Sequence, residues 1–599
     1  MAKKGPVKIE LAKDFKGTLK KVLKTLSPYK IKLFIVVLFA ILSTIFSIIG
    51  PKILGNATTE LFNGLISKLT GGSGINFVAI YKILITLLII YIISMLFSII
   101  QGIIMTNITQ KYTYELRKKV SEKIHKLPMK FFDNKTHGEV LSLITNDIDT
   151  IGMTLNQSAT NIISSIVMII GIVIMMFSIN VTMTFVSFLI LPISIILVAL
   201  IAKKSQKYFE AQQENLAKVN GNIEEMYSAH TIIKAYNAEN KMINIFDENN
   251  EALCTSAWLS QFLSGLMHPI MHFISNIGYV ITAILGGYFC IKGKITIGNI
   301  QSFITYTKNF TKPITEIASE ASQIQAMVAA SERVFEFLES EEEKFTKLSK
   351  LSAGNIKGNV EFKGVNFGYN NNELIIEDFN ALVKSGQKIA IVGPTGAGKT
   401  TIVKLLMRFY ELNSGSILID NKNIEEFNKE DLRNLFGMVL QDTWLFSGTI
   451  MENLRYGRID ATDDEVIEAA RLAHVHHFIK TLPDGYNMKI NEESTNISSG
   501  QKQLLTIARA ILADPKILIL DEATSSVDTR TEILIQRAMD ELMKGRTSFI
   551  IAHRLSTIKN ADLILVINDG NIIEKGTHDE LIKLDGFYAS MYNSQFERI

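Results

Sequence analysis

The sequence predicts two domains of different class: an α-helical transmembrane domain, followed by an α/β domain. Three observations support this prediction. The first half of the 599-residue chain contains long runs without charged residues, the second half contains short apolar strands, and a glycine-rich turn joins one of those strands to a helix. A chain of this length is also too long for one ordinary domain.

Composition narrows the classes of partner. The net charge of +3 is small for this length and gives no reason to expect nucleic acid as a partner. Mean hydropathy is positive although 20% of the residues are charged, which indicates that apolar and polar regions are kept apart along the chain. The two cysteines, Cys254 and Cys290, match no metal or disulfide spacing and are interpreted as spare apolar residues.

Residues 1–32 are rich in lysine and carry apolar residues at amphipathic spacing, namely Phe15, Leu19, Val22, Leu23 and Leu26. This pattern predicts a helix that lies on a membrane surface. We expect no cleaved signal peptide, because no short apolar core is followed by a small-residue cleavage site.

Six apolar stretches are long enough to cross a membrane as helices, and they define a transmembrane domain at residues 33–335. They cover residues 33–51, 83–110, 157–178, 181–202, 263–291 and 295–314. The third and fourth spans lie in a stretch without Asp, Glu, Lys or Arg, and we expect a tight turn between them near Asn180. The sixth span is interrupted by polar residues and by Lys308, which favours a helix that faces a water-filled cavity.

The distribution of lysine and arginine predicts the orientation of these spans. The connections after the second and fourth spans carry most of the positive charge, whereas the opposite side carries only Lys52, Lys68, Lys82, Lys292 and Lys294. The positive-inside rule therefore places both termini and the two connections in the cytosol. Sustained apolar spacing predicts that the connections are helices continuing out of the membrane rather than disordered linkers.

His268 and His272 are four residues apart and could share a helix face as metal ligands. No third ligand lies nearby in the sequence, so ordinary packing or cavity lining is the preferred interpretation. The methionines of spans three to five are likewise interpreted as packing residues.

The α/β half is organised around a glycine-rich turn between an apolar strand, residues 388–392, and a helix predicted at residues 401–410. The turn consists of Gly393, Pro394, Thr395, Gly396, Ala397, Gly398, Lys399 and Thr400. Glycines in this context let backbone N–H groups cradle phosphate oxygens at a helix N-terminus. Lys399 can reach the β- and γ-phosphates, and the Thr400 hydroxyl can coordinate Mg²⁺. The alternative is an ordinary glycine-rich turn in an α/β core.

Other strand ends in this half also carry chemically useful residues. A charged linker at residues 336–356 precedes the first strand, which begins near residue 359 and ends at Tyr369. The Tyr369 ring could stack on a base, with ordinary sheet packing as the alternative. A later strand ends in Asp521 and Glu522, which can hold the water shell of Mg²⁺ and deprotonate an attacking water. A third strand, residues 548–552, delivers His553, which can reach a γ-phosphate.

With these residues in this order, nearly the whole chain resembles the ATP-binding-cassette (ABC) exporters that are built as half-transporters. Residues 495–503 (TNISSGQKQ) match the family's signature region, residues 439–446 its Q-loop and residues 525–528 its D-loop. Residues 131–148 and 232–236 resemble parts of its first and second intracellular loops. The resemblance implies six transmembrane helices with long cytoplasmic extensions, and a P-loop ATPase domain with a helical subdomain at residues 357–599.

The resemblance also implies roles for individual residues toward ATP and Mg²⁺. Tyr369 takes the adenine-stacking position, Glu522 that of the catalytic base and His553 that of the switch histidine. Gln441 would sense the metal, which Thr400 and Asp521 would also hold. The remaining nucleotide contacts would come from the phosphate loop with Lys399 and Thr401, and from Ser498, Ser499, Gly500, Gln501 and Asp528.

In this family two nucleotide-binding domains meet head to tail, so that each ATP lies between one chain's phosphate loop and the other chain's signature. ATP-driven closure would then alternate the cavity between inward- and outward-facing states. The expected partner is therefore a second half-transporter, together with membrane lipid and a small-molecule or lipid-like substrate.

The signature departs from the family pattern LSGGQ, because Ser499 replaces the first glycine and Ile497 replaces leucine. Glycine permits backbone conformations and a close phosphate approach that a Cβ hinders. Lys399, Asp521, Glu522 and His553 are all intact. In this family an altered signature beside intact catalytic residues is typical of one half of a heterodimer, which is the favoured interpretation. A homodimer that tolerates Ser499 is the alternative.

The leading functional hypothesis is an ATP-driven exporter of amphipathic or hydrophobic compounds, similar to bacterial multidrug half-transporters, in a bacterial plasma membrane. A lipid flippase or a dedicated peptide or metabolite exporter on the same fold is the nearest alternative, and uptake by the same fold stays open. An ATP-gated channel or sensor is the alternative from a different class. No residue in the sequence identifies the substrate.

Overall fold

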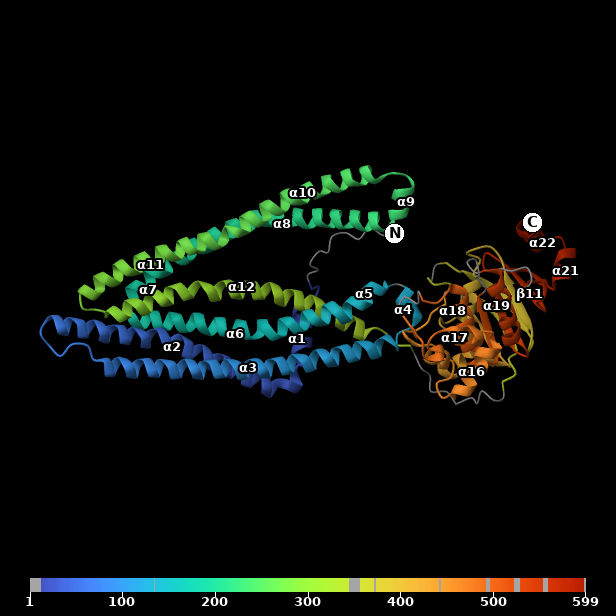
Figure 1. The fold of residues 1–599 in the computed structure, drawn as a ribbon, viewed down its shortest axis with the longest axis horizontal. Helices are drawn as coiled ribbons and strands as arrows, with labels where there is room; N and C mark the ends of the chain where they lie inside the picture. The colour runs from blue at the N-terminus through green and yellow to red at the C-terminus, as the bar shows by residue number, and fades with distance from the viewer. Residues whose placement is uncertain are drawn as a thin grey trace. The chain divides into compact units, whose positions relative to one another are not determined.

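The structure is a computed structural model that describes residues 12–133, 135–343, 356–370, 373–440, 443–491, 496–521, 528–552 and 558–596. The chain divides into two units, which are described separately (Figure 1). Unit 1 is formed by Met1–His125 and Thr136–Ser340, and unit 2 by Lys126–Lys135 and Glu341–Ile599. The α-helical first half and the α/β second half agree with the predicted fold class.

Unit 1 is built from helices joined by short turns. Its helices are α1 (Phe15–Thr25), α2 (Lys30–Leu69), α3 (Phe77–Ile124), α5 (His137–Ser142), α6 (Ile148–Ile179), α7 (Val181–Phe188), α8 (Ile190–Ser228), α9 (His230–Ala235), α10 (Glu239–Gly265), α11 (Met267–Ile291) and α12 (Ile297–Glu339). Side-chain caps mark several helix starts: Asn76, Asn180 and Thr296 each accept a hydrogen bond from the backbone N–H three residues later. Asn180 separates α6 from α7, so the predicted turn is confirmed.

Four helical segments in the described part of the chain are long and apolar enough to cross a membrane: Ser27–Leu69, Phe77–Ile124, Gly138–Ile179 and Glu239–Ile291. They contain the first, second, third and fifth predicted spans. The fourth predicted span, residues 181–202, falls on α7 and α8, and the sixth, residues 295–314, falls mostly on α12. Both stretches are helical, and the count of six spans stays a prediction.

One predicted boundary and one predicted apolar face differ in detail from the structure. The helix α12 continues to Glu339, past the domain end predicted at residue 335, because its buried face includes Val334 and Phe337. In α1, Val22 is buried but Leu23 is 62% exposed, so only part of the predicted apolar face packs within unit 1. The Lys21 ammonium of α1 pairs with the Glu339 carboxylate of α12 at 2.7 Å.

Helices α2 and α3 lie side by side, as do α6 and α12 (Figure 1). Polar groups of α12 bond to carbonyl oxygens of α2 around Pro51, which interrupts the hydrogen-bond ladder of that helix. The Tyr306 hydroxyl donates to the Ile48 carbonyl at 2.8 Å, and the Ser302 hydroxyl donates to the Pro51 carbonyl at 2.9 Å. Apolar residues of several helices, Phe303 among them, form the core around these bonds.

The contact between α6 and α12 also holds two carboxylates with uncharged donors. The hydroxyl of Ser158 and the side-chain amide of Asn161, the latter at 2.8 Å, donate to the Glu320 carboxylate. The Ser165 hydroxyl donates to Glu316 at 2.8 Å. These three donors of α6 lie three and four residues apart, and therefore share one helix face.

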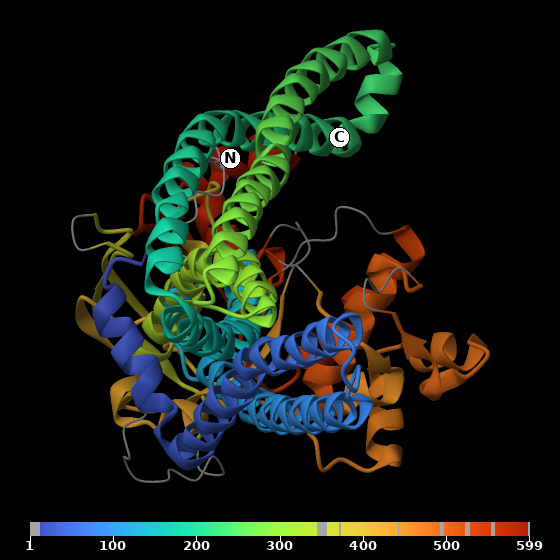
Figure 2. The same ribbon diagram turned by 90° about the vertical axis from the view of Figure 1, so that its left-hand side faces the viewer.

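Helices α8 and α10 pair with each other and form a long hairpin closed by α9 (Figure 2). Its outer part leaves the other helices of unit 1, as Figures 1 and 2 both show. Several large apolar or aromatic side chains on it are exposed: Ile223, Tyr227, Ile232, Tyr236, Ile243, Trp258 and Phe262.

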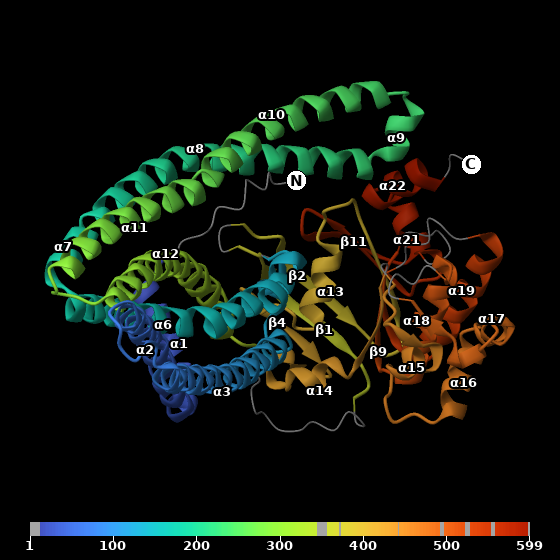
Figure 3. The same cartoon turned by 60° about the vertical axis from the view of Figure 1, so that its left-hand side comes forward.

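Unit 2 is an α/β structure with one mainly parallel sheet (Figure 3). In the described residues this sheet has the order β12-β11-β3-β10-β9-β6 and a second, antiparallel sheet has the order β2-β1-β4-β5. The strands are β1 (Val360–Phe367), β2 (Ile376–Val383), β3 (Lys388–Val392), β4 (Ser414–Ile419), β5 (Lys422–Asn423), β6 (Phe436–Val439), β9 (Ile517–Asp521), β10 (Thr547–Ile551), β11 (Leu563–Asn568) and β12 (Asn571–Gly576), with a small pair β7 (Gly448–Thr449) and β8 (Lys489–Ile490).

The helices of unit 2 are α4 (Met129–Asp133), α13 (Lys399–Leu406), α14 (Lys429–Arg433), α15 (Ile450–Arg455), α16 (Asp463–Leu472), α17 (His476–Thr481), α18 (Ser499–Ala513), α19 (Thr529–Met543), α21 (His578–Lys583) and α22 (Phe587–Phe596). Helices α15, α16 and α17 follow one another along the chain between β7 and β8, as expected for the predicted helical subdomain.

Successive side chains of a strand point to opposite faces of the sheet, and in the main sheet both faces are packed into a hydrophobic core. In β3, Ile389 and Ile391 join the core shared with the antiparallel sheet, while Ala390 and Val392 join the core shared with α18 and α19. The same alternation separates Ile519 from Leu520 in β9. The carboxyl ends of the parallel strands therefore lie along one edge of a sheet that is fixed on both sides.

A cluster of charged side chains around the buried Lys429 holds Glu343, near the start of the second chain segment of unit 2. The Glu343 carboxylate pairs with Lys429 at 3.1 Å and with Arg433 at 2.6 Å, and Lys429 also pairs with Glu411 at 2.9 Å. Burial raises the pKa of Glu343, but its bonds to Arg433 and Lys429 act more strongly together, so that its pKa lies below the usual value. The Glu343 backbone N–H also donates to the Lys126 carbonyl at 2.8 Å.

Candidate nucleotide-binding site

The glycine-rich turn lies at the carboxyl end of β3 and opens α13, as predicted. Gly393 has φ +154°, and a Cβ at this position would lie 2.1 Å from the Ile567 carbonyl oxygen, so only glycine fits. Gly398 is the N-cap of α13 with φ +97°, a left-handed conformation that side chains rarely adopt. Gly393 therefore lets the turn approach the backbone of β11, and Gly398 directs the chain into α13.

Lys399 points back over this turn. Its ammonium donates to the carbonyl oxygens of Gly393 at 2.8 Å and Pro394 at 2.9 Å. Burial lowers the pKa of Lys399 from its usual value, while the negative charge of Asp521 acts in the opposite direction. The ammonium therefore lies inside the loop and is influenced by the Asp521 carboxylate.

The sheet order explains why Lys399 and Asp521 come together although they are far apart in sequence. Strand β10 pairs in parallel with both β3 and β9, and Ile551 is the partner of both Ile391 and Asp521. The ends of β3 and β9 therefore lie at the same edge of the sheet, which is where ligands bind in open α/β sheets. The half-buried Asp521 ends β9, as predicted.

The other residues of the predicted loop divide by exposure. Pro394, Thr395, Gly396 and Thr400 are exposed, whereas Ala397, Gly398 and Thr401 are buried. The Thr400 hydroxyl is therefore on the accessible side of the first turn of α13. Buried Thr401 instead anchors this turn to the protein.

Helix α13 is shorter than predicted: it ends at Leu406, not at Tyr410. Arg408 takes a left-handed conformation, with φ +51°, and this turns the chain out of the helix. Its guanidinium is buried and donates to the Glu411 carboxylate and to carbonyl oxygens near Ile424. These bonds stabilise a helix end that the apolar spacing did not reveal.

Tyr369 lies beside α13, and its role in stacking on a base stays a prediction. Its hydroxyl is 3.4 Å from the Thr401 hydroxyl, and the Lys404 ammonium is 5.7 Å from the centre of its ring. The ring packs edge to face against Phe367 and Tyr410. Tyr369 is thus part of an aromatic cluster rather than an isolated ring on a sheet.

The signature residues form the start of α18. Ser498 is its N-cap and forms a capping box with Gln501, whose side chain accepts from the Ser498 backbone N–H at 3.0 Å. Gly500 is buried. Ser499 is the first residue of the helix and does not have a positive φ.

This conformation corrects one of the two reasons for expecting a damaged signature. An ordinary helical residue needs no glycine for its backbone, so Ser499 causes no conformational strain here. The second reason still holds: the Cβ of Ser499 limits how closely a phosphate can approach the backbone.

Several predicted site residues lie outside the described residues, namely Gln441, Glu522 and His553. The strands that lead to them are described: β6 ends at Val439, β9 at Asp521 and β10 at Ile551. Asp528 is described and caps α19 by accepting a hydrogen bond from the Thr531 backbone N–H. This bond holds the pKa of the exposed Asp528 carboxyl below its usual value.

The described residues contain no group of three or more His, Cys, Asp or Glu placed to hold a metal ion. The side chain of His268 is outside the described set, so its proposed pairing with His272 remains an untested alternative. Thr400 and Asp521, an exposed hydroxyl and a half-buried carboxylate at the same sheet edge, are oxygen ligands of the kind that Mg²⁺ prefers.

The sequence analysis missed two residues beside this site. Tyr410 packs against Tyr369, and its hydroxyl donates to the carboxylate of Asp133 in α4. The signal available for Tyr410 was an aromatic residue at the end of the helix predicted at residues 401–410. Asp133 had none, because its contact joins chain segments far apart in sequence.

Comparison with known proteins agrees with this geometry. Residues 33–314 match the model of the ABC transporter transmembrane region, and residues 376–525 match the ABC transporter model. The chain is 42% identical to YfiC of Bacillus subtilis, an uncharacterized ABC transporter ATP-binding protein, over 100% of this chain and 97% of that protein.

It is also 42% identical to a fatty acid ABC transporter ATP-binding/permease protein of Mycobacterium tuberculosis, over 97% of this chain and 96% of the relative. YgaD of Bacillus subtilis, whose name proposes multidrug export, is 33% identical over 97% of this chain and 99% of its own. With both matched regions in one polypeptide, the chain belongs to the ABC transporters and is a half-transporter that couples ATP hydrolysis to transport.

Proposed function

We propose that this chain is one half of a dimeric exporter that uses ATP to move amphipathic or hydrophobic compounds across a bacterial plasma membrane. The observation that carries the proposal is the placement of Lys399 inside the phosphate loop, under the influence of Asp521, in a chain that also carries long apolar helices. Both termini would lie in the cytosol, in line with the distribution of lysine and arginine.

In this proposal the γ-phosphate of ATP lies near Lys399, and adenine stacks on Tyr369. Thr400 and Asp521, with Gln441, would hold Mg²⁺, which neutralises charge on the phosphates. Glu522 would orient and deprotonate the attacking water, and His553 would contact the γ-phosphate. The backbone turn at Gly393 and Gly398 supports phosphate binding at the start of α13.

The exposed side chains of the α8–α10 hairpin are evidence for assembly with a second half-transporter. Its outer part leaves the rest of unit 1 and exposes Trp258, Ile232 and Tyr236, each by more than half of its surface. Exposed apolar and aromatic side chains on one element are a feature of many protein interfaces. We infer that the hairpin contacts the partner chain.

The partner is proposed to be a different half-transporter. The support is Ser499, because a Cβ and hydroxyl at the first signature glycine restrict the approach of the partner's ATP. Its ordinary helical backbone removes the argument from strain, so a homodimer stays the alternative. Turnover by the chain purified alone in lipid nanodiscs separates the two: robust hydrolysis that Glu522→Gln abolishes would contradict the heterodimer.

The substrate class is proposed from the relatives, whose names include a fatty acid transporter and a multidrug exporter. A fatty acid is an apolar chain with a polar end and so falls within the proposed class of amphipathic compounds. A flippase for lipids and a dedicated peptide or metabolite exporter are alternatives on the same fold.

The test is ATP-dependent uptake into inverted membrane vesicles from cells that express the chain with its partner. A cationic amphipathic dye and a labelled long-chain fatty acid are offered separately. Accumulation against a gradient, lost in Glu522→Gln, is expected for at least one of them. Passage that only equilibrates the concentrations, and that survives in Glu522→Gln, would favour an ATP-gated channel and contradict the proposal.

A further inference from the structure

Two lysines of α12 lie within the sixth predicted membrane span. Apart from Lys308 and Lys312, the predicted spans contain no Asp, Glu, Lys or Arg. Both lysines are exposed in the structure, so neither is used to hold the helices of unit 1 together. A charged side chain at membrane depth is costly, and one that is kept there marks a binding position or a pathway. These two cations therefore call for a function.

The depth of Lys308 separates its ammonium from both membrane surfaces. At about 1.5 Å of rise per residue, Lys308 lies roughly 17 Å along α12 from its start at Ile297, and Lys312 roughly 23 Å. In a hydrocarbon core about 30 Å thick, Lys308 is then close to the middle. Lysines near the ends of a span extend their ammonium groups to the surface, but a lysine in the middle cannot.

The structure balances the charge of Lys312 more fully than that of Lys308. The Lys312 ammonium is 3.7 Å from the Glu316 carboxylate, which also accepts a hydrogen bond from the Ser165 hydroxyl at 2.8 Å. Among the residues that the structure describes, Lys308 has the ring of Tyr279 in α11 at 5.2 Å and no carboxylate as a partner. An aromatic face attracts a cation without neutralising it. Lys308 therefore keeps a positive charge that an anion can complement.

The same face of α12 borders an apolar cavity of about 400 Å³, which lies against α2. Phe62 of α2 and Ile304 and Thr305 of α12 are among the residues that line it. Ile304 and Thr305 precede Lys308 by four and three residues, and Lys312 follows it by four, so these side chains share one helix face. The volume falls within the range of ligand sites, about 300–1,000 Å³. One helix face thus carries an apolar cavity and, next to it, a cation.

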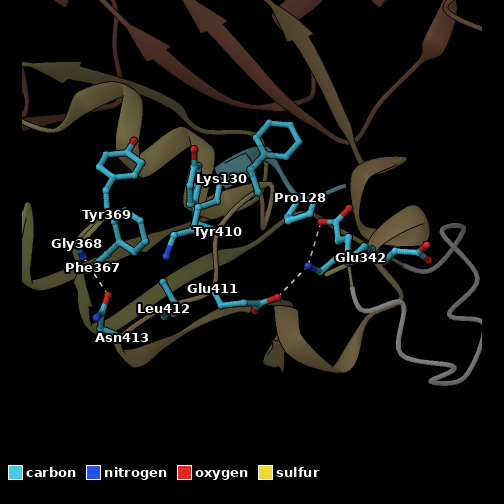
Figure 4. Close-up of a pocket in the computed structure, with 13 residues that line it drawn as sticks. Pro128, Lys130, Glu342, Phe367, Gly368, Tyr369, Tyr410, Glu411, Leu412 and Asn413 are labelled. Carbon is cyan, nitrogen blue, oxygen red and sulfur yellow. Dashed lines mark hydrogen bonds and ion pairs between the residues drawn. The ribbon is translucent and has the colours of Figure 1, made fainter. Parts of the chain in front are cut away.

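A cavity of about 450 Å³ in unit 2 has a different electrostatic character (Figure 4). Cations and carboxylates line it together, and Lys429 in its lining is already paired with Glu343 and Glu411. A lining with both signs of charge selects no sign in a ligand. The cavity beside α12 differs, because both charged residues nearest to it along its helix face are cations.

We propose that Lys308 pairs with the anionic head group of an amphiphile whose apolar chain lies in the cavity between α2 and α12. Lys312 adds positive charge one turn away. This inference rests on the proposed export of amphipathic compounds and deepens it, because it restricts the substrate to anionic members of that class. An anionic head removes the cost of an uncompensated cation at membrane depth, whereas a neutral or cationic head on the same chain leaves it in place.

The experiment measures binding to the chain in nanodiscs of zwitterionic lipid, together with the half-transporter that copurifies with it. The probes are a stearate that carries an anthroyloxy fluorophore, which is anionic, and its neutral methyl ester. Lys308→Gln removes the charge, and Lys308→Arg keeps it. Lys292→Gln is the matched control, because the Lys292 ammonium also lies over a tyrosine ring, that of Tyr288 at 4.4 Å, but outside the predicted spans.

The wild type and Lys292→Gln should bind the labelled stearate at least tenfold more tightly than its methyl ester. In Lys308→Gln this ratio should fall to within twofold, through weaker binding of the stearate alone, and Lys308→Arg should keep it above fivefold. A ratio that persists in Lys308→Gln would overturn the inference. Equal binding of the two probes by the wild type, or binding of neither, would also overturn it.

Competition with unlabelled compounds identifies the head group. Palmitate and palmitoyl lysophosphatidic acid carry a carboxylate and a phosphate on the same kind of chain. Displacement of the labelled stearate by either one supports the inference, and the stronger competitor names the head group. Displacement by neither would count against an anion site.

ATP-dependent uptake into inverted membrane vesicles separates failure of this inference from failure of the proposed function. The labelled stearate should accumulate with the wild type, and at least fivefold less with Lys308→Gln. Accumulation of a cationic dye without accumulation of the stearate would contradict the inference and leave the proposed export in place. Accumulation of neither compound would contradict the proposed function itself, whatever the binding ratios of the Lys308 variants.

Discussion

Each unit contains a buried carboxylate that joins distant parts of the chain, but the two are held differently. In unit 1, Glu320 is 7% exposed and receives hydrogen bonds from the uncharged side chains of Ser158 and Asn161. In unit 2, the Glu343 side chain is 9% exposed and pairs with the cations of Lys429 and Arg433.

The difference follows from the surroundings of the two groups. At about 1.5 Å of rise per residue, Glu320 lies roughly 35 Å along α12 from its start, near the expected cytoplasmic edge of a hydrocarbon core about 30 Å thick. Its partners come from a helix whose predicted span contains no cation, and they are accordingly neutral. Unit 2 is an α/β fold in which Lys and Arg side chains are available as partners.

This comparison predicts an order of effects. Removing one of two cations from an ion cluster leaves part of the carboxylate charge without compensation, and breaking a buried ion pair costs about 3–5 kcal/mol. Removing one of two neutral donors costs less, about 1–2 kcal/mol. Removing an exposed ion pair costs least, about 0–1 kcal/mol.

The largest effect is expected for Lys429→Met. The substitution removes one of the two cations around Glu343 and should lower the free energy of local unfolding by about 3 kcal/mol. The loss of hydrogen-exchange protection in α14 measures it. A cost below about 1 kcal/mol for Lys429→Met would contradict the role given to the cluster.

The contribution of the Glu343 cluster should depend on pH. Because the folded state holds the pKa of Glu343 below its ordinary value of 4.5, the cluster's stabilisation is present above that value and is lost as pH falls through the lowered pKa. The difference in stability between wild type and Lys429→Met should therefore shrink below about pH 4.5. Denaturation midpoints at a series of pH values measure this, and an unchanged difference at low pH would rule the linkage out.

An intermediate effect is expected for Ser158→Ala. Glu320 keeps its bond from Asn161, so the cost should be about 1–2 kcal/mol, seen as a lower melting temperature of the chain in detergent. Ser178→Ala is the matched control in the same helix, because that exposed hydroxyl donates only to the Met175 carbonyl of its own helix. Equal melting temperatures for the two variants would remove the distinction drawn for Glu320.

The smallest effect is expected for Lys21→Ala. Lys21 and Glu339 are 51% and 61% exposed, so water and salt screen their attraction. The loss should stay below about 1 kcal/mol and should vanish in about 1 M salt. A larger loss that salt does not change would show that α1 is held through this pair more firmly than its exposure suggests.

The parts of the molecule that could be predicted from sequence are those determined by local pattern. The strand of residues 388–392, the loop that follows it and the turn at Asn180 depend on consecutive residues, and all three are found as predicted. The proximity of Lys399 and Asp521 was also within reach, because parallel strand ends meet at one edge of a sheet.

The rest depended on contacts between distant residues. The end of α13 is determined by the left-handed Arg408 and its bonds to carbonyl oxygens more than a dozen residues later, which apolar spacing does not encode. The membership of Lys126–Lys135 in unit 2, and the bond from Tyr410 to Asp133, likewise arise only once the chain has folded. The ordinary helical backbone of Ser499 could not be read from its departure from the family pattern.

The most direct test of the central claim, that this chain contains its own ATP-hydrolysing machinery, is ATP hydrolysis in lipid nanodiscs. The chain is purified with whichever half-transporter copurifies with it, and the wild type is compared with Glu522→Gln and Lys399→Ala. We expect Glu522→Gln to lose at least a hundredfold in turnover while still binding Mg²⁺–ATP, and Lys399→Ala to lose binding as well. Turnover that survives both substitutions would show that hydrolysis takes place elsewhere and would contradict the account.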